Sequence, residues 1–127
     1  MINILMVDDH AIVREGICRI IDDTSGITIC AEASTGQEAL DLLWKEKYDL
    51  VILDISMPGK NGLQTLKEIK KYDQHLAIIM LSMHAEEQYA MRAIKAGASG
   101  YITKDAASAQ LIPAIKQVFG GRKYISQ

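Results

Sequence analysis

The sequence is poor in two features that often indicate a protein's class directly, cysteine residues and an excess of basic residues. Its 127 residues include two cysteines, Cys18 and Cys30, which lie in apolar patterns and lack the spacing of metal ligands. We therefore expect small buried thiols rather than a disulfide or a zinc site. The 14 Lys and Arg residues do not outnumber the 16 Asp and Glu residues. Without a basic excess, these residues are not expected to bind duplex DNA or an anionic membrane.

Long apolar runs are also missing. No run approaches the roughly 20 residues that span a bilayer. Residues 1–3 lack the basic character that opens a signal peptide, so we expect a cytoplasmic protein without membrane contact. What the chain does have is 49% hydrophobic and 24% charged residues, with no repeat or low-complexity linker. This composition predicts one soluble domain with a hydrophobic core of its own.

Strand and helix patterns alternate along the whole chain. Runs that are apolar or rich in β-branched residues predict strands over 2–7, 27–33, 50–53, 77–82 and 100–103. The first helix is predicted over 11–21, with an apolar face made of Ile12, Val13, Ile17, Ile20 and Ile21. Thr35, three residues before Glu38, predicts the N-cap of the second helix.

The three remaining helices follow the same alternation. The third is marked by an apolar stripe of Leu63, Leu66 and Ile69. A fourth is predicted over 86–95, ended by Gly97. The fifth is predicted to begin after Ser108 as its N-cap, with Pro113 limiting where the regular helix can start. The polar tail, residues 122–127, has no evident packing partner.

This alternation predicts an α/β fold. Five strands joined by right-handed crossovers form a doubly wound parallel sheet, with five helices distributed over both faces. The expected strand order is 2-1-3-4-5, the flavodoxin-like arrangement. In that order the first and third strands are neighbours. Residues that follow these two strands should therefore meet at one edge of the sheet.

The stretch 48–62, YDLVILDISMPGKNG, supplies one of those residues. Residues 50–53 form an unbroken apolar run, as in a strand buried on both faces, and Asp54 follows at its carboxyl end. Open parallel sheets bind ligands at that end. Asp8 and Asp9 follow the first strand, so we expect three carboxylates to lie together.

Three neighbouring carboxylates favour a bound cation. At about 5 Å each pair repels by roughly 3 kcal/mol, for an effective dielectric constant of about 20. A hard divalent ion held by few protein oxygens and several waters relieves this repulsion, which points to Mg²⁺ rather than Ca²⁺. The plainer alternative is that Asp8 and Asp9 only begin the first helix. A helix start needs one acid and not three, so we favour the cation site.

Three further residues complete a pattern that resembles a known family. Ser82 ends the fourth strand, Tyr101 lies in the fifth, and Lys104 follows it. Asp54 opens the stretch D-x-x-M-P-G-x-x-G. With the acid pair after the first strand, these marks make the whole chain resemble the receiver domain of bacterial two-component response regulators.

The resemblance implies a signalling switch rather than an enzyme with a turnover substrate. Asp54 would accept a phosphoryl group from a sensor histidine kinase. Mg²⁺ would be held by Asp9, Asp54 and the backbone carbonyl of Ser56, with Asp8 acting through water. A carboxylate is a competent nucleophile toward phosphorus, and Lys104 is a point cation for a phosphoryl oxygen.

The resemblance also implies how the signal would spread. Ser82 would be drawn toward the new phosphate, which vacates space behind the fourth strand. Tyr101, on the neighbouring strand, would occupy that space with its ring inward or expose its hydroxyl with its ring outward. These two packings would change the face formed by the fourth helix, the fifth strand and the fifth helix. The alternative is that Tyr101 is simply a half-buried strand aromatic.

The branch of the family is indicated by three local patterns. Asp8-Asp9-His10, the loop 56–58 and the ending Gly-Gly-Arg-Lys-Tyr-Ile-Ser resemble the NarL/FixJ (LuxR-type) branch. In that branch a linker and a helix-turn-helix domain follow. The resemblance thus implies a receiver over residues 1–120 and the start of a linker over 121–127. Transcription control, DNA binding and any phosphorylation-dependent homodimer would belong to the full-length protein.

Two other functions are consistent with parts of the pattern. A Mg²⁺-dependent phosphohydrolase of the haloacid-dehalogenase type also uses Asp after a strand, but it has a second Asp where this chain has Ser56. A degenerate receiver that only binds proteins would have lost Asp9, Asp54 or Lys104. All three are present, so both alternatives are disfavoured.

The remaining predictions concern single residues. Asp105 follows Lys104 where many relatives have Pro, which leaves the isomer of that peptide bond open. His10 is expected at the surface, since neutral imidazole is a poor Mg²⁺ ligand. His84 is expected over the phosphorylation site. Trp44 is expected to pack in the protein rather than to offer a binding platform.

Overall fold

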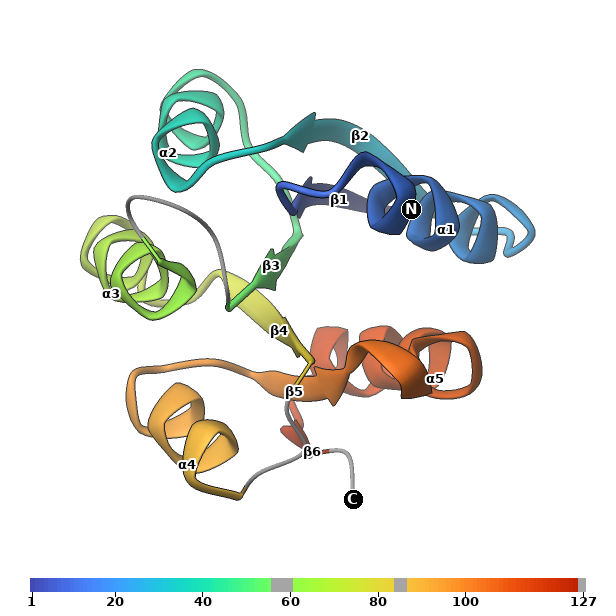
Figure 1. The fold of residues 1–127 in the computed structure, drawn as a ribbon. Helices are drawn as coiled ribbons and strands as arrows, with labels where there is room; N and C mark the ends of the chain where they lie inside the picture. The colour runs from blue at the N-terminus through green and yellow to red at the C-terminus, as the bar shows by residue number, and fades with distance from the viewer. Residues whose placement is uncertain (56–60, 84–86, 126–127) are drawn as a thin grey trace.

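The computed structural model describes residues 1–55, 61–83 and 87–125 (Figure 1). Its strands are β1 (Ile2–Val7), β2 (Ile27–Ala33), β3 (Leu50–Asp54), β4 (Ala77–Ser82), β5 (Gly100–Thr103) and β6 (Tyr124–Ile125). Its helices are α1 (Ala11–Asp22), α2 (Gly36–Lys45), α3 (Gly62–Tyr72), α4 (Glu87–Lys95), α5 (Ala107–Phe119) and the 3₁₀ turn η1 (Lys104–Ala106). None of the helices in these described ranges is long and apolar enough to cross a membrane.

All the described strands form one parallel sheet in the order β2-β1-β3-β4-β5-β6. The first five positions confirm the predicted order. The sixth strand corrects the prediction that the tail has no packing partner, because Tyr124 and Ile125 pair with β5. The Tyr124 hydroxyl also donates a hydrogen bond to Gln110 of α5 at 3.2 Å. Without β6, β5 would be an edge strand with unpaired backbone groups.

The helices cover both faces of the sheet, as predicted (Figure 1). Helices α1 and α5 pack on one face, where Ile17 and Leu111 join the side chains of Leu50 and Ile52. Helices α2, α3 and α4 pack on the other face, in a cluster that includes Val51 and Leu53. The alternate residues of β3 therefore belong to opposite cores, and this explains why its sequence is apolar without interruption.

Helix starts follow the predictions only in part. The Thr35 hydroxyl accepts a hydrogen bond from the Glu38 amide at 3.1 Å, which confirms the N-cap of α2. The prediction of Ser108 as the N-cap of α5 is wrong, since α5 begins at Ala107. The chain enters α5 from η1, whose residues are already helical, so no side-chain cap is formed. Pro113 lies inside α5 rather than setting its start.

Ile12 and Cys30 are predicted to be buried, but both are exposed because of the geometry of the helix and the strand that contain them. Ile12 is 84% exposed. At 3.6 residues per turn it lies about 140° around α1 from the buried Ile17. Cys30 is also exposed, although both cysteines are free as expected. The pairing of β1 with β2 passes from Ile29 to Ala31, so Cys30 is the extra residue of a bulge.

The prediction that Trp44 packs in the protein is also wrong. Its side chain is 74% exposed at the end of α2. Its only described ring contact is with Tyr72 at the end of α3, at 5.2 Å between ring centroids. Tyr72 is itself 52% exposed. Leu43 is the last buried residue of α2, and Trp44, one position later, points about 100° around the helix from it.

Candidate functional site

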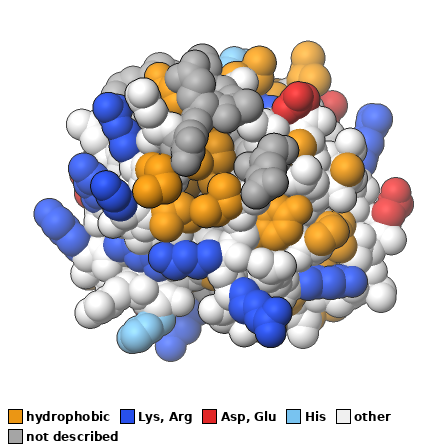
Figure 2. Space-filling view, turned by 90° about the horizontal axis from the view of Figure 1, so that it is seen from below, with side chains coloured by type: hydrophobic (Ala, Val, Ile, Leu, Met, Phe, Trp, Pro, Cys, Tyr) orange, Lys and Arg blue, Asp and Glu red, His pale blue; other side chains and the backbone are white. Residues whose placement is uncertain are grey.

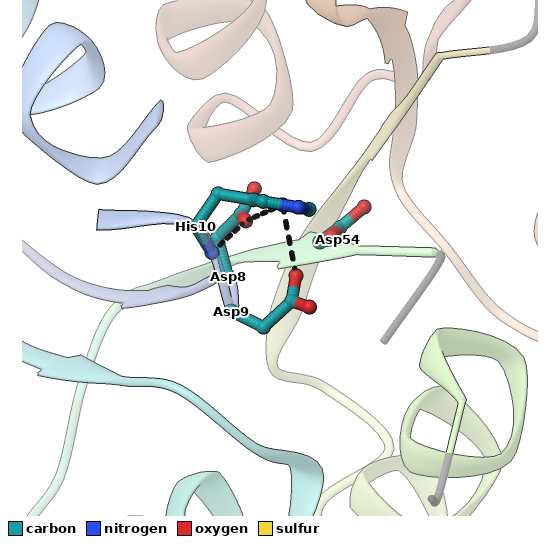
Figure 3. A group of neighbouring side chains, drawn as sticks. All are labelled: Asp8, Asp9, His10 and Asp54. Atoms are coloured by element: carbon teal, nitrogen blue, oxygen red, sulfur yellow. Dashed lines mark hydrogen bonds and ion pairs between the residues drawn. The ribbon is translucent and has the colours of Figure 1, made fainter. Parts of the chain in front are cut away.

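The predicted acids meet where β1 and β3 end. These strands are neighbours with Val7 opposite Leu53, so Asp8 and Asp54 emerge side by side. Both acids are fully buried. Ligand atoms of Asp8, Asp9, His10 and Asp54 all lie within 4.8 Å of one another (Figure 3). The tertiary structure thus confirms the expected convergence of three carboxylates.

Lys104 brings a positive charge into this cluster. It begins η1 directly after β5, and only 11% of its side chain is exposed. Its Nζ lies 3.2 Å from Asp8 Oδ2 and 3.3 Å from Asp54 Oδ1. One ammonium group among three carboxylates leaves a net negative charge, so the site still attracts a cation. The peptide bond between Lys104 and Asp105 is trans, which decides the question that the sequence left open.

His10 lies on the solvent side of the cluster. Its side chain is 62% exposed, which agrees with the predicted surface position. Its ring nevertheless points at the acids, with Nδ1 at 3.0 Å from Asp9 Oδ1 and 3.3 Å from Asp8 Oδ1 (Figure 3). The His10 amide donates a hydrogen bond to Asp8 Oδ1 at 2.8 Å. His10 is therefore a neighbour of the site, a contact that the sequence did not predict.

Two carboxylate oxygens of the cluster fit a metal ion. Within the described residues, Asp8 Oδ2 and Asp9 Oδ1 are buried and accept no hydrogen bond. The nitrogens of Lys104 and His10 lie at ion-pair distance from them but do not have hydrogen-bond geometry. A buried carboxylate oxygen without a donor is costly, whereas hard divalent cations bind such oxygens. The residues present therefore suit Mg²⁺.

Ser82 and Tyr101 lie on the strands next to Asp54. Asp54 pairs with Leu81 of β4, so Ser82 is one residue further toward the carboxyl end. Ser82 is fully buried. Tyr101, on β5, is 1% exposed and belongs to the core under α2, α3 and α4. Its ring is thus inside the protein, more deeply than the half-buried position considered from sequence.

Some predicted features lie outside the described residues. These are the Ser56 carbonyl, the loop 56–58 and His84. The structure also shows contacts at the site for two residues to which sequence reasoning assigned no role, Arg14 and the final glycine of the D-x-x-M-P-G-x-x-G stretch, Gly62. Arg14 of α1 donates a hydrogen bond to the backbone carbonyl of Asp8 at 2.5 Å. Gly62, the first residue of α3, lies against the Asp54 backbone and donates its amide to the Ile55 carbonyl at 3.0 Å.

Comparisons with known proteins identify the family of this chain. A family model described as "Response regulator receiver domain" matches residues 4–116. Response regulator UvrY from Escherichia coli strain K12 is 41% identical over 126 residues, which cover 99% of this chain and 58% of UvrY. Response regulator GacA from Pseudomonas aeruginosa is 36% identical, with 99% and 59% covered. This chain therefore spans less than two thirds of the length of these relatives.

A solved structure shows the same fold. It is described as a two-component response regulator of the LuxR family from Aurantimonas sp. SI85-9A1 and superposes with a TM-score of 0.95. The identity is 37%, and the match covers 99% of this chain and 90% of that chain. Both the sequence and the architecture support the branch predicted above. With its acid cluster at the end of β1 and β3, this chain belongs to the family of response regulator receiver domains.

Proposed function

We propose that this chain is a phosphorylation-controlled switch whose phosphoacceptor is Asp54. The observation that carries the proposal is the position of Asp54, buried at the end of the central strand with Lys104 Nζ at 3.3 Å from its Oδ1. Asp8 and Asp9 contribute oxygens to the same cluster. A nucleophilic oxygen, a fixed cation and a place for a divalent metal are the elements that phosphoryl transfer needs.

The proposed donor is a sensor histidine kinase. A carboxylate oxygen of Asp54 attacks phosphorus, a new O–P bond forms, and the P–N bond to the kinase imidazole breaks with its electron pair left on the ring nitrogen. Lys104 binds a phosphoryl oxygen, and the Ser82 hydroxyl donates a hydrogen bond to another. Asp9, Asp54 and the Ser56 carbonyl would hold Mg²⁺, with Asp8 acting through water, and the ion would supply charge neutralisation at the phosphoryl group.

The proposed switch runs from Ser82 to Tyr101. The Tyr101 ring is buried in the core under α2, α3 and α4. Movement of Ser82 toward a phosphate would change the space behind β4 that this ring can occupy. The face of α4, β5 and α5 is the expected output surface. Apolar side chains gather on the side of the molecule where α4 lies, with Lys and Arg around them (Figure 2). Met91, Arg92 and Lys95 are among the residues that line a hollow there.

The proposed output lies beyond this chain. Because the matched relatives are longer than these residues, we propose that residues 1–120 regulate a C-terminal helix-turn-helix domain, with a linker that starts at 121–127. DNA binding and any phosphorylation-dependent homodimer are part of this proposal. The pairing of Tyr124 with β5 ties the start of that linker to the proposed output face.

A mass spectrum tests the phosphoacceptor. The chain is incubated with a small phosphodonor and Mg²⁺, and the wild type is expected to gain one phosphoryl group. Asp54→Asn should fold and gain none, because the amide is not a nucleophile toward phosphorus. Asp41→Asn, which changes an exposed acid of α2, is the matched control and should be labelled like the wild type. Normal labelling of Asp54→Asn would refute the assignment.

A further inference from the structure

Arg14 connects the acidic turn to strand β2. Its Nη1 donates a hydrogen bond to the Asp8 carbonyl at 2.5 Å, and its Nε donates to Glu32 Oε1 at 3.1 Å. Only 20% of the Arg14 side chain is exposed, so the guanidinium is packed between its partners. The Arg14 amide also donates to the His10 carbonyl at 3.1 Å, in the first turn of α1. A single side chain therefore links the turn, α1 and β2.

The oxygen that Arg14 holds belongs to the peptide bond between Asp8 and Asp9. Since a peptide bond is planar, holding this oxygen restricts the orientation of the whole plane and the backbone direction at Asp9. The Asp8 amide donates to the Ala33 carbonyl of β2 at 3.0 Å. Both backbone polar groups of Asp8 are thus tied to β2, one directly and one through Arg14 and Glu32.

We propose that Arg14, held in place by Glu32, is a positioning residue of the cation site. It keeps the Asp8-Asp9 peptide in the orientation in which both carboxylates converge on Asp54, so that a cation binds with little rearrangement. This inference rests on the proposed function, because it assumes that these acids bind Mg²⁺. Residues that orient metal ligands without touching the metal typically change metal affinity by about 10- to 100-fold.

Electrostatics alone predicts the opposite effect. The positive charge of Arg14 lies beside Asp8 and repels an approaching cation, so its removal should strengthen Mg²⁺ binding. Loss of the hydrogen bond from Arg14 to the Asp8 carbonyl should instead weaken Mg²⁺ binding. The direction in which the Kd for Mg²⁺ moves therefore distinguishes a positioning role from a role as a charge, and a merely structural role would leave the Kd of the folded protein unchanged.

The experiment is a titration of the purified chain with Mg²⁺ alone, followed by backbone amide NMR shifts. Arg14→Met keeps the aliphatic stem and removes the guanidinium, and we expect its Kd to rise about tenfold, the lower end of such effects. Glu32→Asp, which keeps the charge of residue 32 but shortens the side chain that holds Arg14, should raise the Kd by less, because Arg14 keeps its contact with Asp8. Arg19→Met is the matched control. It removes the same charge from an exposed position of α1, and its Kd should stay within about twofold of the wild type because the charge is screened.

Two titrations separate failure of this inference from failure of the proposed function. If the wild type shows no saturable binding, or if Asp9→Ala binds as well as the wild type, the cation site itself is refuted. If those two behave as expected but Arg14→Met binds as tightly as Arg19→Met, the positioning role is refuted. Should Arg14→Met not fold, Glu32→Asp, at an exposed position of edge strand β2, decides the question because it leaves the charge unchanged. An unchanged Kd in that variant overturns the proposal.

Discussion

Gly62 lies so close to the phosphoacceptor strand that the structure predicts a large effect of one added methyl group. A Cβ atom at this position would lie 2.2 Å from the Asp54 carbonyl oxygen, 2.5 Å from Ile55 Cα and 2.9 Å from the Asp54 carbonyl carbon. All three atoms belong to the backbone, so no side-chain rotation can relieve the contact. Gly62→Ala must instead move the start of α3 away from Asp54.

The size of this effect follows from the distances. A carbon–oxygen contact is ordinarily about 3.3 Å or longer, so the helix start has to move by roughly 1 Å. Overpacking of this kind typically costs about 1–3 kcal/mol. The hydrogen bond from the Gly62 amide to the Ile55 carbonyl, at 3.0 Å, would be stretched as well, which costs about 1 kcal/mol. The gain from replacing a helical glycine is up to about 1 kcal/mol. We expect a net loss of about 2 kcal/mol.

Urea unfolding followed by far-UV circular dichroism measures this loss, and a melting curve should show a fall of about 8 °C for a domain of this size. Gly16→Ala is the matched control. Apart from the neighbouring residues and the backbone of α1 itself, no atom of the described residues lies within 4 Å of a Cβ built at Gly16, which is inside α1. That variant should be more stable by about 0.5–1 kcal/mol. The reasoning is refuted if Gly62→Ala loses less than about 1 kcal/mol, the lower limit for overpacking, or if Gly16→Ala loses as much.

Two further predictions follow from the site. At a Mg²⁺ concentration of ten times its Kd, the wild type should gain about 1.4 kcal/mol, seen as a rise in melting temperature. Asp9→Ala should abolish that rise and Asp41→Ala should keep it; a rise that survives in Asp9→Ala would place the cation elsewhere. Binding of beryllofluoride, an acyl-phosphate mimic, should change the rotamer or the exposure of the Tyr101 ring, which is 1% exposed now. The measurement is NMR of the ring protons, and the same rotamer and exposure in both states would make Tyr101 a packing residue only.

Much of the fold and part of the site could be predicted from the sequence because they depend on local patterns. Periodicity identified five strands and five helices, the crossover rule gave a doubly wound parallel sheet, and the flavodoxin-like arrangement supplied the order 2-1-3-4-5 that the sheet contains. That order alone brings Asp8 and Asp54 together, since β1 and β3 are neighbours in it. The apolar run of β3 likewise predicted a strand buried on both faces, and all its residues are buried.

Other features depend on contacts between residues of different elements, which the local sequence pattern does not predict. The second strand's bulge at Cys30 comes from its pairing with β1, and the exposure of Trp44 comes from where the core under α2 ends. β6 exists because β5 leaves an edge for it to pair with. The contact of Arg14 with the Asp8 carbonyl joins residues of a turn and a helix in a geometry that spacing does not specify.

The division has a physical reason. The face of a helix or strand that packs on the core sets the spacing of its apolar residues. This spacing involves only residues close in sequence, so helices and strands can be predicted from it. Close approaches such as that of Gly62 to the Asp54 carbonyl arise from packing between elements that are brought together by the folded chain. The sequence by itself determined the order of β1 to β5 and the acids that follow β1 and β3. Only the tertiary structure decided which residues hold those acids in place.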